Sequence, residues 1–360
     1  MNTNLGSAGN VLLCLHYGIG DVVMQLPVIR SLRRHLPNAR VTALGARPAV
    51  QLVADCDGVD ASKSVQEWGL GHWYDEGTPQ IKAALSDWLR EERFDLILDV
   101  SHAVRAIRNV IWSVEGRWTI LDSDPSRYVS SLRSGASAMC AAVAAGWGIA
   151  VEDGCRAWIQ IGDPRREWAA RLRKRHHPTA RTLIGLSPVA SSPLKRWPVE
   201  RLAAVAAPLI GRRDCGVVVF GGNQRSLADQ LADRLSTLTT VTTLRAVHLL
   251  HAAALLRHCA LLICNDTGLM HMAAAVDTPV AALFGPSSAE IYLPPAPQAR
   301  ALTSGVTCPH RNTQSLGPSA CILKGRCLIG RRSCIDAIRA EDVEAVAERM
   351  IGARAEGYTP

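Results

Sequence analysis

The sequence predicts an α/β fold made of two doubly wound halves, each a parallel sheet covered by helices. Apolar runs of strand length alternate with helical patterns along the chain. These runs are continuously apolar, as parallel strands buried on both faces are. Glycine or polar residues follow several runs, at the carboxyl ends of strands where open α/β sheets bind ligands. We expect a cleft between the two halves.

Four strands are predicted in the first half, at residues 11–15, 41–45, 95–100 and 118–121. A helix is expected from Asp21 to His35, with a kink at Pro27 inside it. The segment 59–79 has no clear period and is expected to be an irregular loop. Residues 136–151 are rich in alanine and too short to cross a membrane, so they predict a buried helix.

The second half repeats the alternation, with strands predicted at residues 182–188, 217–222, 260–266 and 279–285. A polar, arginine-rich helix before them ends at a sequence break and predicts a linker. The expected divisions are an N-terminal domain 1–163, a linker 164–181, a C-terminal domain 182–340 with a cysteine-rich segment 308–334, and a last helix within 341–360. One expectation for this amphipathic helix is that it packs back on the N-terminal domain.

Length and composition narrow the function classes. The chain has 360 residues, enough for about two domains, and has no apolar run long enough for a transmembrane helix. Its N-terminus has no basic segment before an apolar run, so we expect no signal peptide and a cytoplasmic protein. The net charge of +8 suits a phosphorylated substrate, an anionic membrane surface or nucleic acid. Nucleic acid is the least favoured because no basic stripe interleaved with aromatic residues, zinc finger or RNP motif is present.

The stretch 264–288 is the most informative motif. An apolar strand ends at Asp266 and Thr267, and Gly268 and a helix that carries His271 follow. The alternative is a helix cap and a buried core histidine. Ligand contact is favoured because this turn is more polar than a packing joint needs. A threonine hydroxyl, a neutral histidine and helix amides all donate hydrogen bonds to phosphate.

A glycine-rich turn follows the first strand. Gly18 and Gly20 permit close approach of a ligand to the backbone. Asp21 starts the next helix, and its position alone favours a helix cap. Pro27 close by makes a functional role more attractive. The pattern differs from GxGxxG and is weak evidence for a dinucleotide.

Two further loops carry candidate ligand groups. Ser191, Ser192 and Lys195 follow the first strand of the second half. A lysine at the carboxyl end of a strand can hold a diphosphate, although a solvated lysine is the favoured interpretation for a generic loop. Gly221 and Gly222 end the next strand and either admit a ligand or form a plain turn.

Eleven cysteines are present, and seven lie in apolar contexts typical of core positions. The other four are Cys308, Cys321, Cys327 and Cys334. They contain no CxxC pair, so their spacing matches a zinc ribbon poorly. Unligated thiols are the favoured interpretation, and a structural zinc or iron site is the alternative.

Taken together, the motifs resemble the ADP-heptose:lipopolysaccharide heptosyltransferases, glycosyltransferase family nine. The matching segments are HYGIGDVVMQLPVIRSLRRHLPNARV, SPVASSPLKRWPVERL, FGGNQ and NDTGLMHMAAAVDTPVAALFGPSS. The resemblance spans nearly the whole chain. It implies a GT-B fold of two Rossmann-like domains facing across a cleft, with the donor mostly on the C-terminal domain and the acceptor on the N-terminal one. It further implies transfer of heptose from ADP-heptose to an acceptor hydroxyl, with inversion at the anomeric carbon. The favoured acceptor is the lipopolysaccharide inner core at the inner membrane.

By position, the resemblance implies that Asp21 is the general base and that Lys195 neutralises the departing ADP. It implies a diphosphate cradle made of Thr267, Gly268, Leu269 and His271, with Asp266 ordering the site. Ser191, Ser192, Gly221 and Gly222 complete the expected donor-binding set, and Gly18 and Gly20 form the expected acceptor-side loop. A cation and amides aimed at the leaving diphosphate need no metal, so no cofactor is expected. The sequence Asn223-Gln224-Arg225 stands where the family often has an acidic residue for the donor ribose.

Three alternatives stay open. The first is a heptosyltransferase with an autotransporter-type protein acceptor, which bound iron at the late cysteines would favour. The second is a nucleotide-sugar epimerase of GT-B fold, which would turn over a UDP-sugar without an acceptor. The third is a non-catalytic binder, in which Asp21→Ala would leave function in the cell unchanged.

Overall fold

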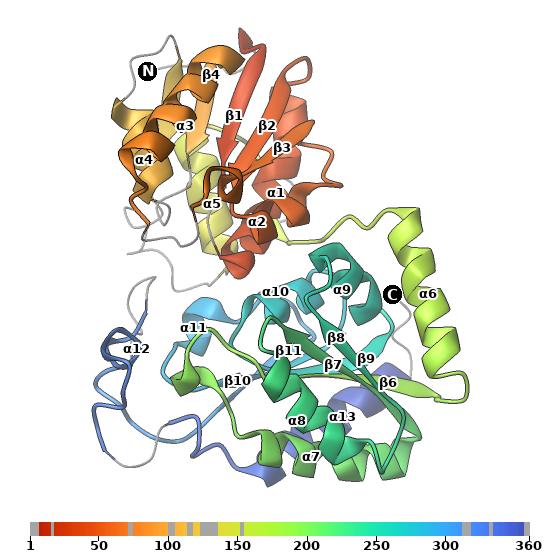
Figure 1. Ribbon diagram of the computed structural model, residues 1–360. Helices are drawn as coiled ribbons and strands as arrows, with labels where there is room; N and C mark the ends of the chain where they lie inside the picture. Colours follow the sequence, from red (N-terminus) through yellow and green to blue (C-terminus); the bar gives the residue numbers. More distant parts are fainter. Residues whose placement is uncertain are drawn as a thin grey trace. The chain divides into compact units, whose positions relative to one another are not determined.

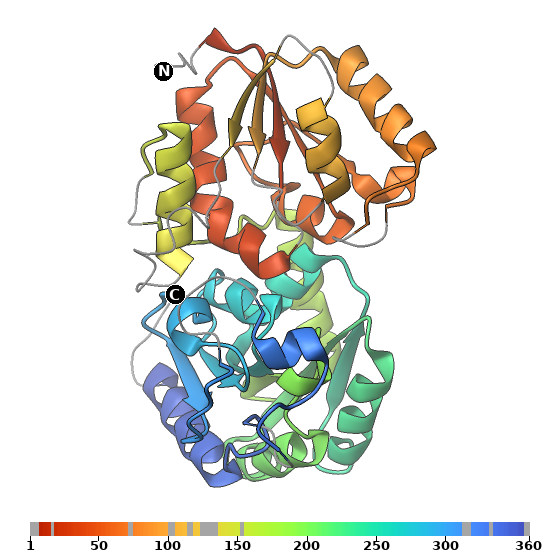
Figure 2. The ribbon, with the colours of Figure 1, turned by 90° about the vertical axis from the view of Figure 1, so that its left-hand side faces the viewer.

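The computed structural model describes residues 7–15, 18–70, 75–99, 105–113, 118–122, 136–151, 155–311, 318–330 and 334–355. The chain divides into two compact units, and each is described by itself. The first unit is Met1–Tyr128 with Ser137–Gln160, and the second is Val129–Ala136 with Ile161–Pro360. The described strands of each unit form one parallel sheet with helices on both faces (Figures 1 and 2).

A five-stranded sheet in the order β3-β2-β1-β4-β5 forms the centre of the first unit. Its strands are β1 (Asn10–Cys14), β2 (Arg40–Gly45), β3 (Ala61–Ser64), β4 (Leu96–Asp99) and β5 (Thr119–Asp122). Cys14 of β1 lies opposite Leu44 on one side and Asp99 on the other. The chain proceeds from β1 toward β2 and from β4 toward β5, so the order reverses between β1 and β4. Such a reversal is where open α/β sheets bind ligands.

The helices of the first unit are α1 (Ile19–His35), α2 (Arg47–Val53), α3 (Pro79–Glu92), α4 (Arg105–Ser113) and α5 (Ala136–Trp147). Figure 2 shows α1 on one face of the sheet and α3 on the other. α1 continues through Pro27, whose carbonyl oxygen accepts a hydrogen bond of 2.9 Å from the Ser31 hydroxyl. α5 buries Cys140, Val143 and Trp147, in agreement with the predicted buried helix.

The segment 59–79 is more regular than the sequence predicts. It contains the edge strand β3 and a 3-10 turn, η2 (Val65–Trp68). The Ser64 hydroxyl and the Glu67 carboxylate cap this turn reciprocally. The sequence ASKS of β3 has no apolar run because an edge strand is only partly covered. Residues 71–74 of the expected loop lie outside the described residues.

The second unit contains a six-stranded sheet in the order β11-β10-β9-β6-β7-β8. Its strands are β6 (Thr182–Ser187), β7 (Cys215–Gly222), β8 (Val241–Arg245), β9 (Cys259–Asn265), β10 (Val280–Phe284) and β11 (Ala299–Thr303). The four central strands are the ones that the sequence predicts. The pattern did not predict β8 and β11, which are the polar edge strands VTTLR and ARALT. The strand order reverses between β6 and β9.

Helices cover both faces of this sheet. They are α6 (Asp163–His176), α7 (Val199–Arg213), α8 (Arg225–Leu235), α9 (Leu249–Leu256), α10 (Gly268–Ala274), α11 (Ala289–Tyr292), α12 (Ala320–Lys324) and α13 (Ala340–Ala355). α7, α8 and α13 share one face, and α9 and α10 lie on the other (Figure 1). No helix among the described residues is long and apolar enough to cross a membrane.

One expected domain assignment is wrong for this unit. Residues 164–181 are mostly the helix α6, which packs on α9 within the second unit, and not a linker. The last helix, α13, packs on α7 and the sheet of the second unit. Its apolar face consists of Val343, Ala347 and Ile351, which are at most 4% exposed and complete the core of the second unit.

Candidate functional site

Lys195 and Asp266 meet where the strand order of the second sheet reverses. Lys195 ends the 3-10 turn η5 (Pro193–Lys195) after β6, and Asp266 directly follows β9. The ammonium Nζ of Lys195 lies 2.6 Å from Oδ2 of Asp266. Pairing of β6 with β9, with Ser187 opposite Cys264, brings these distant residues together. The side chains are only 18% and 7% exposed, so solvent screens this charge-assisted hydrogen bond weakly.

A third polar group fixes the carboxylate of Asp266. The hydroxyl of Ser287, in the turn after β10, donates a hydrogen bond of 2.5 Å to the same Oδ2. The amide of Asp266 also donates to the carbonyl oxygen of Leu283 at 3.1 Å. The carboxylate of Asp266 is therefore held in place by Ser287 and in turn fixes the ammonium of Lys195. Ser287 was not among the predicted site residues, although it lies in the motif GPSS.

Asn265 attaches the Lys195 loop to the sheet. Its Oδ1 accepts a hydrogen bond of 2.9 Å from the amide of Trp197, and its Nδ2 donates to the carbonyl oxygens of Pro188 and Val189 at 3.1 and 3.2 Å. Trp197 is itself 1% exposed. Both ends of the loop that carries Lys195 are thus held by one buried amide. The signal in the sequence is a polar side chain at the end of the buried strand LLICN.

We expect Asn265→Ala to lower the free energy of unfolding by about 1–3 kcal/mol, because it leaves the Trp197 amide and two carbonyl oxygens without their partner. It should also weaken ADP binding by loosening the loop. Urea unfolding and calorimetry with ADP measure the two effects. Asn223→Ala, at an exposed asparagine after β7, is the matched control. Equal stability of the two variants would contradict this role of Asn265.

The carbonyl oxygen of Ala190 is a second anchor of the same loop. It accepts hydrogen bonds from Nε2 of Gln224 at 2.8 Å and from Nε and Nη2 of Arg196 at 3.2 and 3.1 Å. The Ser192 hydroxyl accepts from the amide of Leu194 at 3.3 Å and thereby caps η5. Ser191 is exposed on the loop. Of the two predicted serines, Ser192 therefore has a structural use.

Gly221 and Gly222 serve different purposes in the structure. A Cβ at Gly221 would lie 2.5 Å from the Cβ of Ala228, so the missing side chain lets α8 pack on β7. Gly222 has a φ of +50°, which glycine adopts easily, and open space beside it. Close helix packing accounts for Gly221 without a ligand.

We expect Gly221→Ala to lower the free energy of unfolding by about 1–3 kcal/mol, because the new methyl group has no room against α8. The double variant Gly221→Ala/Ala228→Gly should recover part of this loss, since it removes the opposing Cβ. Urea unfolding of both variants checks the prediction. An unchanged midpoint for the single variant would contradict the packing explanation.

The turn after β9 contains a buried hydroxyl that has no hydrogen-bond partner among the described residues. Thr267 precedes α10, but its side chain makes no capping hydrogen bond. Its Oγ1 is buried and has no partner in the part of the chain that the structure describes. Gly268 and Leu269 are partly exposed, and His271 is 5% exposed. The alternative of a helix cap therefore does not explain the Thr267 hydroxyl.

The predicted residues of the first unit lie at its own strand reversal. Gly18 precedes α1 in an extended conformation, and Gly20 and the half-buried Asp21 are in the first turn of α1. The wholly buried carboxylate of Asp99 ends the neighbouring strand β4. Asp21 thus belongs to the first unit, and Lys195, Asp266, Thr267 and His271 belong to the second.

The late cysteines line one small cavity in the second unit. Cys308, Cys321, Cys327 and Cys334 surround it with His310 and Arg311. Burial raises the pKa of the Cys334 thiol, and a hydrogen bond from Arg311 counteracts this in part. Among the described residues, no three histidine, cysteine or acidic side chains are arranged to hold a metal ion. A guanidinium cation against Cys334 also fits a bound metal cation poorly.

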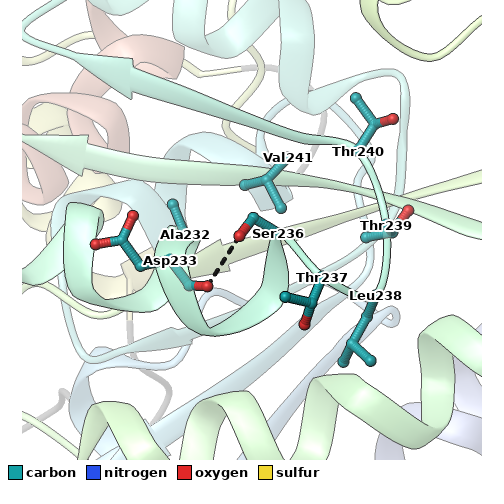
Figure 3. Close-up of a pocket in the computed structure, with 8 residues that line it drawn as sticks. All are labelled: Ala232, Asp233, Ser236, Thr237, Leu238, Thr239, Thr240 and Val241. Carbon is teal, nitrogen blue, oxygen red and sulfur yellow. Dashed lines mark hydrogen bonds between the residues drawn. The ribbon is translucent and has the colours of Figure 1, made fainter.

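A larger depression lies at the opposite end of the second sheet. It is formed by the end of α8, the following loop and the start of β8, and three threonines and Ser236 line it (Figure 3). Asp233 is its one charged lining residue. The depression lies at the amino end of β8, whereas Lys195 and Asp266 follow the carboxyl ends of β6 and β9. This depression therefore does not belong to the candidate site.

Two Rossmann-like units, with charged groups where the strand order reverses, place the protein in the GT-B class of folds. A glycosyltransferase family 9 structure from Veillonella parvula matches with a TM-score of 0.73 and 21% identity, and the match covers 98% of this chain and 99% of that one. The ADP-heptose lipopolysaccharide heptosyltransferase II of E. coli matches with a TM-score of 0.66 and 19% identity, over 96% and 99% of the chains. At these identities the likeness establishes the fold.

Part of the chain is also similar to known proteins in sequence. Residues 158–317 match the model of glycosyltransferase family 9 (heptosyltransferase). Lipooligosaccharide heptosyltransferase 2 of Haemophilus influenzae is 35% identical over 125 residues, which are 32% of this chain and 34% of the relative. The match thus spans about a third of the curated relative's length. Residues 158–317 are thus similar to glycosyltransferase family 9 in sequence.

Proposed function

We propose that the protein is an inverting glycosyltransferase that moves a heptose from ADP-heptose to a hydroxyl of the lipopolysaccharide inner core. The observation that carries the proposal is the buried Lys195–Asp266 pair within the region of the family match. A strand reversal is also where nucleotides bind in doubly wound folds. The proposed partners are the nucleotide-sugar donor and a glycolipid acceptor at the cytoplasmic face of the inner membrane.

The proposed donor chemistry concerns the charge on ADP. When the bond between the anomeric carbon and the diphosphate breaks, the terminal phosphate gains negative charge. The Lys195 ammonium, held by Asp266, stabilises that charge most in the transition state. The Thr267 hydroxyl has a proton to donate and no protein acceptor among the described residues, so it suits a phosphate oxygen. With Gly268, Leu269 and His271 it forms the proposed diphosphate cradle, which requires no metal.

The proposed acceptor chemistry assigns one role to the first unit. The acceptor oxygen attacks the anomeric carbon from the face opposite the leaving ADP, which inverts the configuration. Its proton passes to the Asp21 carboxylate, the proposed general base. The first turn of α1 suits a carboxylate because the positive end of the helix dipole stabilises its charged form.

A nucleotide panel followed by a transfer assay tests the function. We expect ADP to raise the melting temperature and UDP, GDP and NAD to leave it unchanged. We then expect ADP release from ADP-heptose that depends on lipopolysaccharide lacking the relevant heptose. Stabilisation by UDP alone, with turnover of a UDP-sugar in the absence of acceptor, would contradict the proposal and favour an epimerase.

A further inference from the structure

The exposed face of α6 carries the densest run of positive charge among the described helices. Four of the five residues from 171 to 175 are cationic. We define the basic α6 face as the exposed side chains of Arg166, Arg171, Lys174 and Arg175. Residues three and four apart lie on one side of a helix, so 171, 174 and 175 are neighbours on this face.

Packing of α6 on α9 fixes the orientation of this helix. Ala169 is wholly buried, and the ring of Trp168 lies 4.6 Å from the ring of His251 on α9 in an edge-on arrangement. Trp168 is the single aromatic residue of α6. The ring of Trp168 lies beside the basic α6 face, since Arg171 is three residues away, and it is engaged by His251 of α9.

The acidic residues of α6 neutralise only part of this charge. Asp163 pairs with Arg166, and Glu167 pairs with Arg171 at 3.3 Å. These side chains are all at least half exposed, so the pairs are weak. In the part of the chain that the structure describes, no aspartate or glutamate forms an ion pair with Lys174 or Arg175.

The stability of α6 does not require so many cations. A positive charge in the last turn of a helix is favourable through the helix dipole. Further cations three and four residues apart repel each other and destabilise the helix. Arg171, Lys174 and Arg175 stand in this relation, so their mutual repulsion offsets part of the favourable dipole interaction.

Arginines of α6 contribute to the lowered pKa values of three nearby histidines. Burial lowers the pKa of His177, His251 and His258, and neighbouring arginines lower it further. Arg165 acts on His251, and Arg173 acts on both His177 and His258. α9, which packs on α6, contributes no acidic residue that would offset these arginines.

We propose that the basic α6 face binds the anionic phospholipid surface of a membrane. Clustered lysine and arginine side chains on one exposed helix face bind anionic lipid head groups. A nucleic acid is the other polyanion that could bind, but single-stranded binding relies on aromatic rings, and the one ring of α6 is packed on His251. The preference for lipid over nucleic acid also rests on the proposed function, since a glycolipid acceptor brings the enzyme to a membrane.

Vesicle sedimentation tests the proposal on the full chain. We expect the protein to sediment with vesicles of phosphatidylcholine and phosphatidylglycerol in equal parts, and to stay in solution with phosphatidylcholine alone. The variant Arg171→Gln/Lys174→Gln/Arg175→Gln should bind the anionic vesicles at least about tenfold more weakly. Binding should also fall sharply as the salt concentration rises from about 0.1 M to about 1 M.

The matched control removes the same charge from elsewhere in the second unit. Arg212→Gln/Arg234→Gln/Arg339→Gln replaces three exposed arginines on or beside other helices, and it should bind as the unchanged protein does. Equal loss in both variants, or binding to neither vesicle, overturns the proposal. Binding of a single-stranded oligonucleotide that is tighter than vesicle binding and is lost in the α6 variant overturns the lipid assignment in favour of nucleic acid. ADP calorimetry on all three proteins separates these results from a failure of the proposed function, because none of the proposed ADP-binding residues lies on α6.

Discussion

Replacement of Lys195 by alanine is expected to lower turnover of ADP-heptose by about 100- to 1000-fold, the usual effect of removing one group that stabilises developing charge. ADP affinity should fall with it by about tenfold or more, because hydrogen bonds to charged groups are worth about 1.5–3 kcal/mol. The physical reason is the carboxylate that remains. Asp266 is 7% exposed, and without the ammonium at 2.6 Å it would face the diphosphate as an uncompensated negative charge.

Calorimetry with ADP and single-turnover assays measure these two losses. Lys324→Ala is the control, since Lys324 is an exposed lysine of the same unit. Lys195→Arg should recover only part of the activity, because the planar guanidinium cannot take the place of a compact ammonium between Asp266 and a phosphate. Unchanged ADP affinity in Lys195→Ala would remove the leaving-group role.

Asp21→Asn is expected to lower turnover by about 100- to 10,000-fold and to leave ADP affinity unchanged. The amide has the size of the carboxylate but cannot accept the acceptor proton, and general base catalysis contributes about this factor. Because Asp21 is in the first unit and the proposed ADP grip is in the second, the two quantities should separate.

Asp163→Asn is the matched control, since Asp163 also stands in the first turn of a helix. Both substitutions lose the favourable helix dipole interaction, worth about 0.3–1 kcal/mol, so that loss cannot account for a difference in turnover between them. If Asp21→Asn keeps full turnover, Asp21 is not the base. If it loses ADP affinity as well as turnover, its role is in binding.

The fold could be predicted where burial leaves a periodic pattern. β6, β7, β9 and β10 are covered on both faces, and their apolar runs predict them. The edge strands β3, β8 and β11 are polar on one side and carry no such run. Local sequence therefore identifies the central strands of both sheets and misses three of the four edge strands.

The assignment of α6 failed for a different reason. Its composition is polar, and Ala169 is its one wholly buried residue, so no apolar stripe shows that it packs. The contact between Trp168 and His251 joins residues that are distant in sequence. The apolar face of α13 was predictable, but its partner was not, because periodicity shows that a face is buried and does not show against what.

Some contacts of the candidate site could be predicted from the sequence, and others depend on strand pairing that the sequence does not show. Lys195 and Asp266 each follow a predicted buried strand, and parallel strands end at the same edge of a sheet, so their proximity follows from order along the chain. Ser287 meets them only because β10 pairs with β9, which no short motif encodes. Asn265 ends a buried strand, and its three backbone partners come from a loop about 70 residues earlier.

Pairing of β6 with β9 has a consequence for the behaviour of this protein on heating. Lys195 and Asp266 follow β6 and β9, which are neighbouring strands in the interior of the second sheet. The loop that carries Lys195 is held at both ends by the buried Asn265, which ends β9, so it should stay in place as long as the sheet does. Loss of nucleotide affinity on warming is therefore expected to coincide with melting of that sheet, as one sharp event without a half-active intermediate.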